Sequence, residues 1–154
     1  MAKVSKSLQQ AIESLHIADV YLKATRAQCL DDFDPKFVDV QAELQVQQMH
    51  VVRRSEVIQV EGDSQLLRVY IRLGTRWIMP REGDEPEVKA FVEGDYIAEY
   101  QMVAPLEQAA IDEFALKNAS YHVWPYWREF LSSQCDRLRL PRVVLPTTQF
   151  CQQS

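Results

Sequence analysis

Glycine, cysteine and histidine are all scarce in this chain of 154 residues. The four glycines stand apart from one another and form no phosphate-cradling loop, which disfavours an enzyme driven by ATP or NAD. The three cysteines are odd in number and lack metal-site or redox spacing, so no disulfide framework is expected. His16, His50 and His122 have no second ligand at a metal-binding interval. We therefore expect no metal and no cofactor.

Catalytic signatures are missing as well. Ser120 lies two positions before His122, but neither has the strand-turn-helix glycine context of a nucleophile elbow. The acidic group Asp31, Asp32 and Asp34 does not continue into the glycine and distal glutamate of a calcium loop, so a solvated turn is favoured. We expect no catalytic residues, and the protein is not predicted to be an enzyme.

Long apolar runs and an excess of positive charge are also absent. Charged residues interrupt each apolar run well before the roughly 20 residues needed to cross a bilayer, and the N-terminal residues lack the apolar core of a signal peptide. A cytoplasmic protein without membrane insertion is expected. The formal net charge of -5 repels phosphate backbones and disfavours a nucleic-acid partner. With 47% hydrophobic and 25% charged residues, the composition is that of one folded domain.

Alternation of apolar and polar residues predicts four strands in the first two thirds of the chain. The first strand changes parity at Ala18-Asp19, which indicates a β-bulge. The clearest alternation runs over Val38–Gln47, and the extended pattern continues over Met49–Val60. The expected strands are residues 15–28, 38–60, 67–78 and 88–102.

From Val103 the apolar period changes to three and four, which predicts helices with an interruption near Asn118. The second and longer helix carries an apolar stripe as far as Leu138. Four strands followed by helices predict an α+β fold, with a four-stranded antiparallel sheet and C-terminal helices packed on one face. The expected parts are a polar N-terminal tail or short helical turn at 1–14, one domain at 15–146 and a short C-terminal tail at 147–154.

The longer helix concentrates aromatic side chains at Tyr121, Trp124, Tyr126, Trp127 and Phe130. Ordinary core packing against the sheet is one interpretation. The alternative places part of this cluster at a subunit interface or in an apolar groove, because one sheet cannot cover aromatic residues on several sides of a helix.

The same region carries a motif. The run Asn118–Glu129 holds a Pro-Tyr-x-Arg-Glu string, and residues 140–146 form a Leu- and Pro-containing segment after the helix. With Tyr21-x-Lys23 in the first strand, these features resemble the SecB family of protein-export chaperones over residues 15–146. The resemblance implies an antiparallel four-stranded sheet, a homotetramer built as a dimer of dimers, and ATP-independent capture of unfolded polypeptides.

The sequence departs from the family in two ways. If Tyr21 and Lys23 fix the register, the acidic positions that dock the translocase ATPase SecA fall on Ala24 and Gln28, which carry no charge. Ser154 follows the helix closely, so no second C-terminal helix is expected. The resemblance makes SecA a possible partner, but both departures disfavour it. Divergent SecB-like members are dedicated antitoxin chaperones, so protein export and a toxin-antitoxin system are both open.

The main hypothesis is a holdase that binds unfolded or non-native polypeptide clients by burying their apolar side chains. The alternative is an adaptor or assembly protein that uses the same fold to bind one folded partner. The residues predicted to bind clients, each with a core position as the alternative, are Phe33, Phe37, Leu44, Val46, Trp77, Tyr96 and Tyr100. The motif predicted to lie at a subunit interface or to be structural comprises Trp124, Pro125, Tyr126, Trp127, Arg128 and Glu129.

Overall fold

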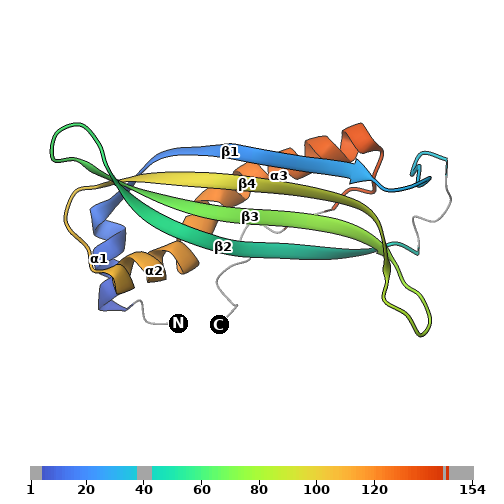
Figure 1. Ribbon diagram of the computed structural model, residues 1–154, viewed down its shortest axis with the longest axis horizontal. Helices are drawn as coiled ribbons and strands as arrows, with labels where there is room; N and C mark the ends of the chain where they lie inside the picture. The colour runs from blue at the N-terminus through green and yellow to red at the C-terminus, as the bar shows by residue number, and fades with distance from the viewer. Residues whose placement is uncertain (1–4, 38–42, 144, 146–154) are drawn as a thin grey trace.

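The computed structural model describes residues 5–37, 43–143 and 145 (Figure 1). The expected C-terminal tail, residues 147–154, therefore lies outside the described part. Its elements in chain order are α1 (Lys6–Ser14), β1 (Leu15–Cys29), β2 (Gln45–Gln59), β3 (Gln65–Met79), β4 (Glu87–Met102), α2 (Gln108–Lys117) and α3 (Ala119–Leu138). The strands form one antiparallel sheet in the order β1-β4-β3-β2, so β1 and β2 are its edges. The predicted four-stranded α+β architecture is confirmed.

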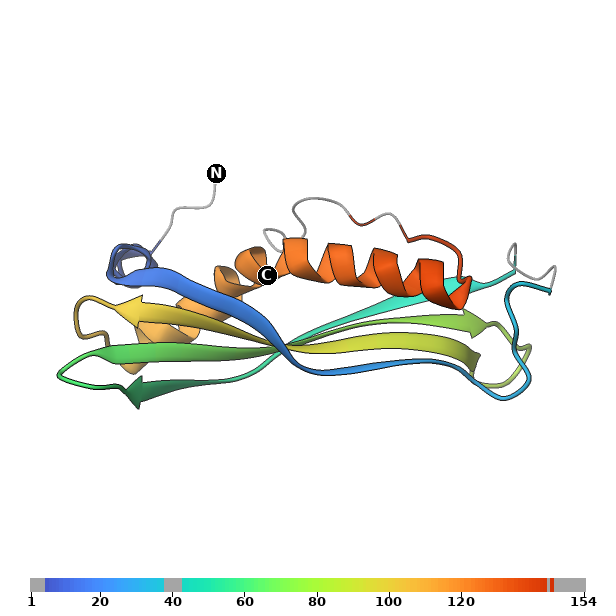
Figure 2. The ribbon, with the colours of Figure 1, turned by 90° about the horizontal axis from the view of Figure 1, so that it is seen from above.

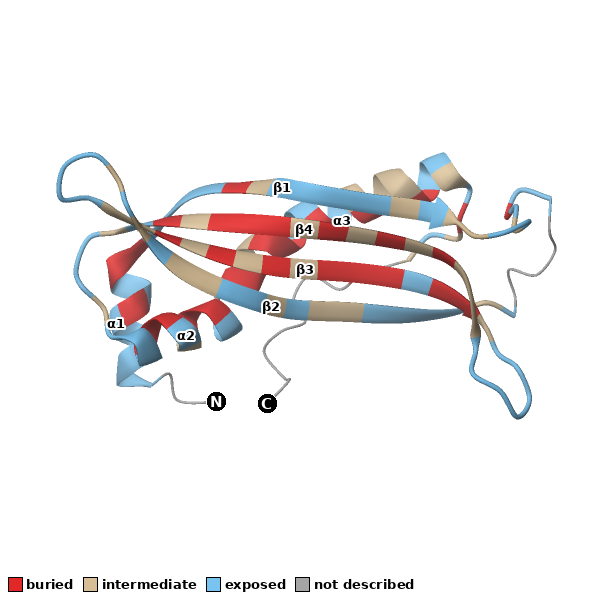
Figure 3. Ribbon diagram, viewed as in Figure 1, coloured by how far each residue is buried: buried red, intermediate tan, exposed pale blue. Residues whose placement is uncertain are grey.

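The two central strands show how the sheet is covered. Every second side chain of β3, from Leu67 to Trp77, is buried beneath the helices. β4 pairs with β3 so that buried positions meet, as at Leu67 with Tyr100 and Ile71 with Tyr96. Burial is therefore concentrated on β3 and β4, while the edge strands are largely exposed (Figure 3). We call the face toward the helices the inner face and the opposite face the outer face.

Both edge strands contain β-bulges. β1 shifts register at Ala18 and again at Lys23, and β2 shifts register at Arg53. The shift at Ala18 confirms the bulge predicted from the change of parity. Bulges increase the local right-handed twist of a sheet. The strong twist is evident in Figure 2, where the strands cross near the middle of the view.

Helix α3 lies along the inner face (Figure 2). Trp124 and Trp127 face the sheet and are buried, and the ring centroid of Trp127 lies 6.5 Å from that of Tyr96 in an edge-on contact. Gly94 permits this approach, because a Cβ there would lie 2.9 Å from Tyr96 Cε2 and 3.6 Å from Trp127 Cζ3. Tyr126 faces away from the sheet and is 51% exposed. The aromatic cluster is thus divided between the core and an exposed helix face.

The N-terminal residues form helix α1, so the helical alternative replaces the expected tail. The Ser5 hydroxyl oxygen accepts the Leu8 N–H at 3.0 Å, which caps the helix, and the hydroxyl donates to Glu113 of α2 at 2.7 Å. Leu8 and Ala11, three residues apart, are buried in the common core. Only one side of this short helix packs against the core, so most of its residues are polar and its sequence resembles that of a tail.

The predicted start of the second strand is wrong. β2 begins at Gln45 rather than at Val38; residues 38–42 lie outside the described part, and the two residues that follow them are not in a strand. Gln45 pairs with Ile78, close to the end of β3. Pro80 follows this end and has no N–H to donate, so β2 has no partner to extend against.

The predicted start of the first C-terminal helix is also wrong. α2 begins at Gln108 rather than at Val103: Pro105 disfavours helical backbone at residue 104, and the N-cap residue Glu107 has extended backbone. The predicted interruption at Asn118 is confirmed, since this residue separates α2 from α3 and its N–H bonds to the carbonyl of Phe114. No helix within the described residues is long and apolar enough to span a membrane.

Two partly buried histidines connect the start of α3 to the sheet. Nε2 of His50 lies 2.6 Å from the Ser120 hydroxyl, and Nδ1 of His122 lies 2.8 Å from the Tyr100 hydroxyl. Burial lowers the pKa of both imidazoles below their usual value of about 6.5. The neutral form of His122 can accept a hydrogen bond from Tyr100, a role that its Nδ1 loses on protonation.

Replacing Trp127 with Ala should lower the free energy of unfolding by about 3–5 kcal/mol, because burial is lost and a cavity remains. The exposed neighbour provides a matched control: Tyr126→Ala should cost about 1 kcal/mol or less. Urea denaturation of both variants measures the difference. Similar losses in the two variants would contradict the core position of Trp127.

Acidification should destabilise the fold through His50 and His122. Both have a lower pKa in the folded than in the unfolded chain, so their stabilisation is complete above about pH 7.5 and is lost as the pH falls below about 6.5. The double variant His50→Gln, His122→Asn should flatten the dependence of the unfolding free energy between about pH 7.5 and 5.5, in denaturant titrations, since it removes both titrating groups. His16→Gln, an exposed change, is the control. An unaltered pH dependence in the double variant would rule out this assignment.

Candidate peptide-binding surface

Exposed apolar side chains gather along the two edge strands. On β1 they are Ile17 and Leu22, and on β2 they are Val46, Val51 and Val57, with exposed fractions between 37% and 52%. The outer side of each edge strand also presents a row of backbone N–H and C=O groups that no strand of the subunit pairs. Backbone hydrogen-bonding groups beside apolar side chains are what an extended peptide needs in order to add a strand to a sheet.

A pocket of about 590 Å³ opens on the outer face beside β2. Its apolar lining comes from Leu30, Met49, Val88 and Phe91, all half-buried. Methionine is unbranched and polarizable, so Met49 can adapt to apolar groups of different shape. We refer to this site as the Met49 pocket.

Gly74 provides the space for the Met49 pocket. A Cβ at this position would lie 2.9 Å from Met49 Cε and 3.3 Å from Glu93 Cγ. Gly74 does not have a positive φ, unlike Gly62 and Gly83, so its backbone does not require glycine. The missing side chain at Gly74 therefore serves close approach, a role that glycine often has inside a strand.

Three of the predicted client-binding residues belong to the core. Trp77, Tyr96 and Tyr100 are almost completely buried. They occupy inward positions of β3 and β4, beneath the helices. For these three, the core alternative is the one that the structure shows, and they are not available on the surface of the subunit.

The other four predicted residues lie nearer to solvent. Phe33 and Leu44 are half-buried and pack against the core. Phe37 is 77% exposed, and Val46 is exposed on the β2 edge. Only Phe37 and Val46 thus present substantial apolar surface, and their role in client binding stays a prediction.

The helical period divides the motif Trp124–Glu129 into buried and exposed residues. Its two tryptophans are buried, whereas Pro125, Tyr126, Arg128 and Glu129 are exposed, and all but Tyr126 border a hollow beside the segment that follows α3. These exposed residues are the part of the motif that a second subunit can contact. The interface role, with ion pairs of Arg128 and Glu129 across helices, stays a prediction.

The Met49 pocket is not predictable from the alternation of the sequence. The lining of this pocket comes from the residue after β1 and from β2, β3 and β4, and alternation along one strand does not show that these four segments meet. The isolated Gly74 within a strand pattern was the available signal, since interior glycines mark sites of close approach. Within the described residues, no group of three or more His, Cys, Asp or Glu side chains is arranged to hold a metal ion.

Comparison with protein-family models and with curated proteins gave no match. Comparison with solved structures gave a match to the Mycobacterium tuberculosis SecB-like chaperone Rv1957, in complex with a ChAD peptide from the Rv1956 HigA1 antitoxin. The TM-score is 0.69 and the identity 15%, and the match covers 94% of this chain and 98% of that chain. At this identity the similarity establishes the fold. The chain has a SecB-like fold, as the resemblance in its sequence implied.

Proposed function

We propose that the protein is an ATP-independent chaperone that holds unfolded or non-native polypeptides. The observation that carries the proposal is the exposed apolar surface of the β2 edge and the adjoining Met49 pocket, on a SecB-like fold. The structural neighbour is itself a SecB-like chaperone bound to an antitoxin peptide, which supports a polypeptide as the client.

Strand addition to β2 accounts for both backbone and side-chain binding. Val46 and Val57 pair with inward positions of β3, whereas Met49 and Val51 pair with outward positions. Successive side chains of a client strand beside β2 would point to the two faces in turn. Those on the outer face would reach the Met49 pocket, and those on the inner face would contact Val46 and Val57.

The energetics of such contacts suit a holdase that does not use ATP. Full burial of one large apolar side chain contributes about 1.5–3 kcal/mol, and ordering the client offsets part of this gain. Backbone hydrogen bonds to the edge add affinity without reading the client sequence. Several weak contacts together give binding that is useful and still reversible.

Assembly into a homo-oligomer, with the tetramer of the resemblance as the expected form, is part of the proposal. The β1 edge and the exposed side of α3 around Tyr126 are the surfaces that support it. The antitoxin peptide of the neighbour favours a dedicated antitoxin client over general protein export. Ala24 and Gln28 are exposed and uncharged, so no acidic side chain supports SecA docking there.

The purified protein should suppress the aggregation of several unrelated denatured proteins, because its contacts are apolar or to backbone. Light scattering during dilution of the substrates from denaturant measures this, and size exclusion coupled to light scattering gives the stoichiometry of the complexes. ATP should make no difference. An absence of suppression, together with tight binding of one native protein, would establish the adaptor alternative instead.

Filling the Met49 pocket should weaken client binding. Gly74→Val adds bulk where a Cβ already approaches Met49, and loss of one buried apolar side chain of the client corresponds to a Kd about tenfold higher or more. Fluorescence anisotropy with a labelled unfolded protein gives the Kd. The paired variant Gly74→Val, Met49→Ala returns space to the pocket and should recover much of the affinity. A folded Gly74→Val protein with unchanged Kd would show that clients do not use this pocket.

A further inference from the structure

A second hollow crosses the middle of the outer face, with a volume of about 310 Å³. Its cationic lining comes from both edge strands, with Lys23 on β1 and Arg53 and Arg54 on β2. Tyr70 and Asp95, from the two central strands, lie between them. We call this hollow the central groove. It differs from the Met49 pocket in its lining, which is charged rather than apolar.

The two outermost cations occupy β-bulges. Lys23 and Arg53 are the residues at which β1 and β2 shift register. The residues immediately before them, Leu22 and Val52, lie at the same level of the sheet: Leu22 pairs with Tyr96 of β4, Tyr96 pairs with Ile71 of β3, and Ile71 pairs with Val52. A bulge re-aims a side chain and bends its strand. The two bulges thus bring a cation from each edge to the same groove.

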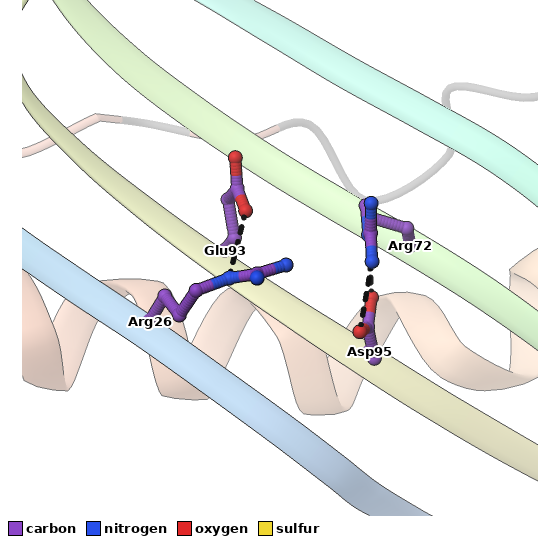
Figure 4. A network of polar contacts seen from close by, with 4 residues as sticks. All are labelled: Arg26, Arg72, Glu93 and Asp95. Atoms are coloured by element: carbon purple, nitrogen blue, oxygen red, sulfur yellow. Dashed lines mark hydrogen bonds and ion pairs between the residues drawn. The ribbon is translucent and has the colours of Figure 1, made fainter.

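Carboxylates on the outer face are already engaged by other arginines (Figure 4). Asp95 accepts two hydrogen bonds from Arg72, at 2.7 and 3.1 Å, and Glu93 lies 3.3 Å from Arg26. Within the described part of the chain, Lys23 and Arg53 form no ion pair. Arg53 contributes to the electrostatic field at Asp95 without pairing with it, so neither cation is held by a direct contact with a described carboxylate.

An aromatic ring holds the cations in place. Lys23 Nζ lies 5.7 Å from the centroid of the Tyr70 ring, and the guanidinium carbon of Arg54 lies 4.1 Å from it. The Tyr70 hydroxyl donates to Glu56 at 2.6 Å, which fixes the ring. Cation–π contacts orient a charged group without using its N–H donors. Lys23 thus keeps its donors beside the groove, whereas Arg54 uses one donor nitrogen, Nη1, on Glu56 at 3.4 Å and keeps the others.

We propose that the central groove docks an acidic segment of a partner protein, whose carboxylates bind Lys23, Arg53 and Arg54. The whole chain carries a net charge of -5, so a cationic groove is a local feature that selects and orients a complementary partner. The neighbouring Glu56, Glu93 and Asp95 place negative charge around the groove. This pattern favours a peptide with spaced carboxylates over a continuous polyphosphate. Docking here uses ionic contacts to outward side chains, whereas client holding uses apolar contacts and the backbone edge of the same strand β2.

The test uses the whole protein and a labelled peptide of about 12 residues with glutamates spaced by Gly and Ser, which offers no apolar side chain to the holdase surface. Fluorescence anisotropy should show binding that weakens about tenfold or more between about 50 and 250 mM salt, because the contacts are ionic. The same peptide with Gln in place of Glu should not bind.

Lys23→Ala with Arg53→Ala should weaken binding of the glutamate peptide about tenfold or more. Lys23→Ala alone, which leaves the β2 edge unchanged, should also weaken the peptide and should leave suppression of aggregation unchanged. Arg137→Ala with Arg142→Ala removes the same charge from the helical side of the molecule and should retain binding. The proposal is overturned if the parent protein does not bind the peptide, if both double variants weaken it equally, or if a single-stranded oligonucleotide binds the groove more tightly than the peptide.

Discussion

One-sided burial of a four-stranded sheet is the constraint on which the structure depends. The three helices cover the inner face, and their apolar side chains meet those of β3 and β4 in one core. Nothing in the described chain covers the outer face or pairs with the outer sides of β1 and β2. A sheet of this kind has two unpaired edges, and native proteins normally protect such edges with charge, bulges or a partner. Here the edges retain apolar side chains, and this retention underlies the proposed chaperone activity.

The outer face remains compatible with water because it carries charged side chains, many of them paired with an opposite charge on the neighbouring strand. Cross-strand pairs such as Arg72 with Asp95, and Arg68 with Glu99 at 3.7 Å, place opposite charges on neighbouring strands. The pairing of Arg72 also holds the pKa of the Asp95 carboxyl below its usual range. The paired charges divide the outer face between an apolar pocket at one end of β2 and a cationic groove at its middle. One face thereby offers two surfaces with different chemistry.

Sequence patterns predicted the order and type of the strands, the bulge at Ala18 and the break at Asn118, because these depend on local alternation and period. They did not predict that residues 6–14 fold as a packed helix or that β2 begins at Gln45, since both depend on the partner element. Parity along β3 and β4 likewise does not show which face the helices cover, so it leaves both a client-binding and a core position open for Trp77 and Tyr100, which lie in the core. The Met49 pocket needs four distant segments and is visible only in three dimensions.

The central claim is that a non-native polypeptide adds to the free edge of the sheet at β2. Hydrogen exchange of the backbone amides, compared with and without a bound unfolded client, tests this most directly. The account predicts slower exchange along residues 45–59, on the amides that point away from β3, with little change in β4, whose amides are already paired on both sides. Client binding that leaves β2 exchange unchanged and protects another element would contradict it.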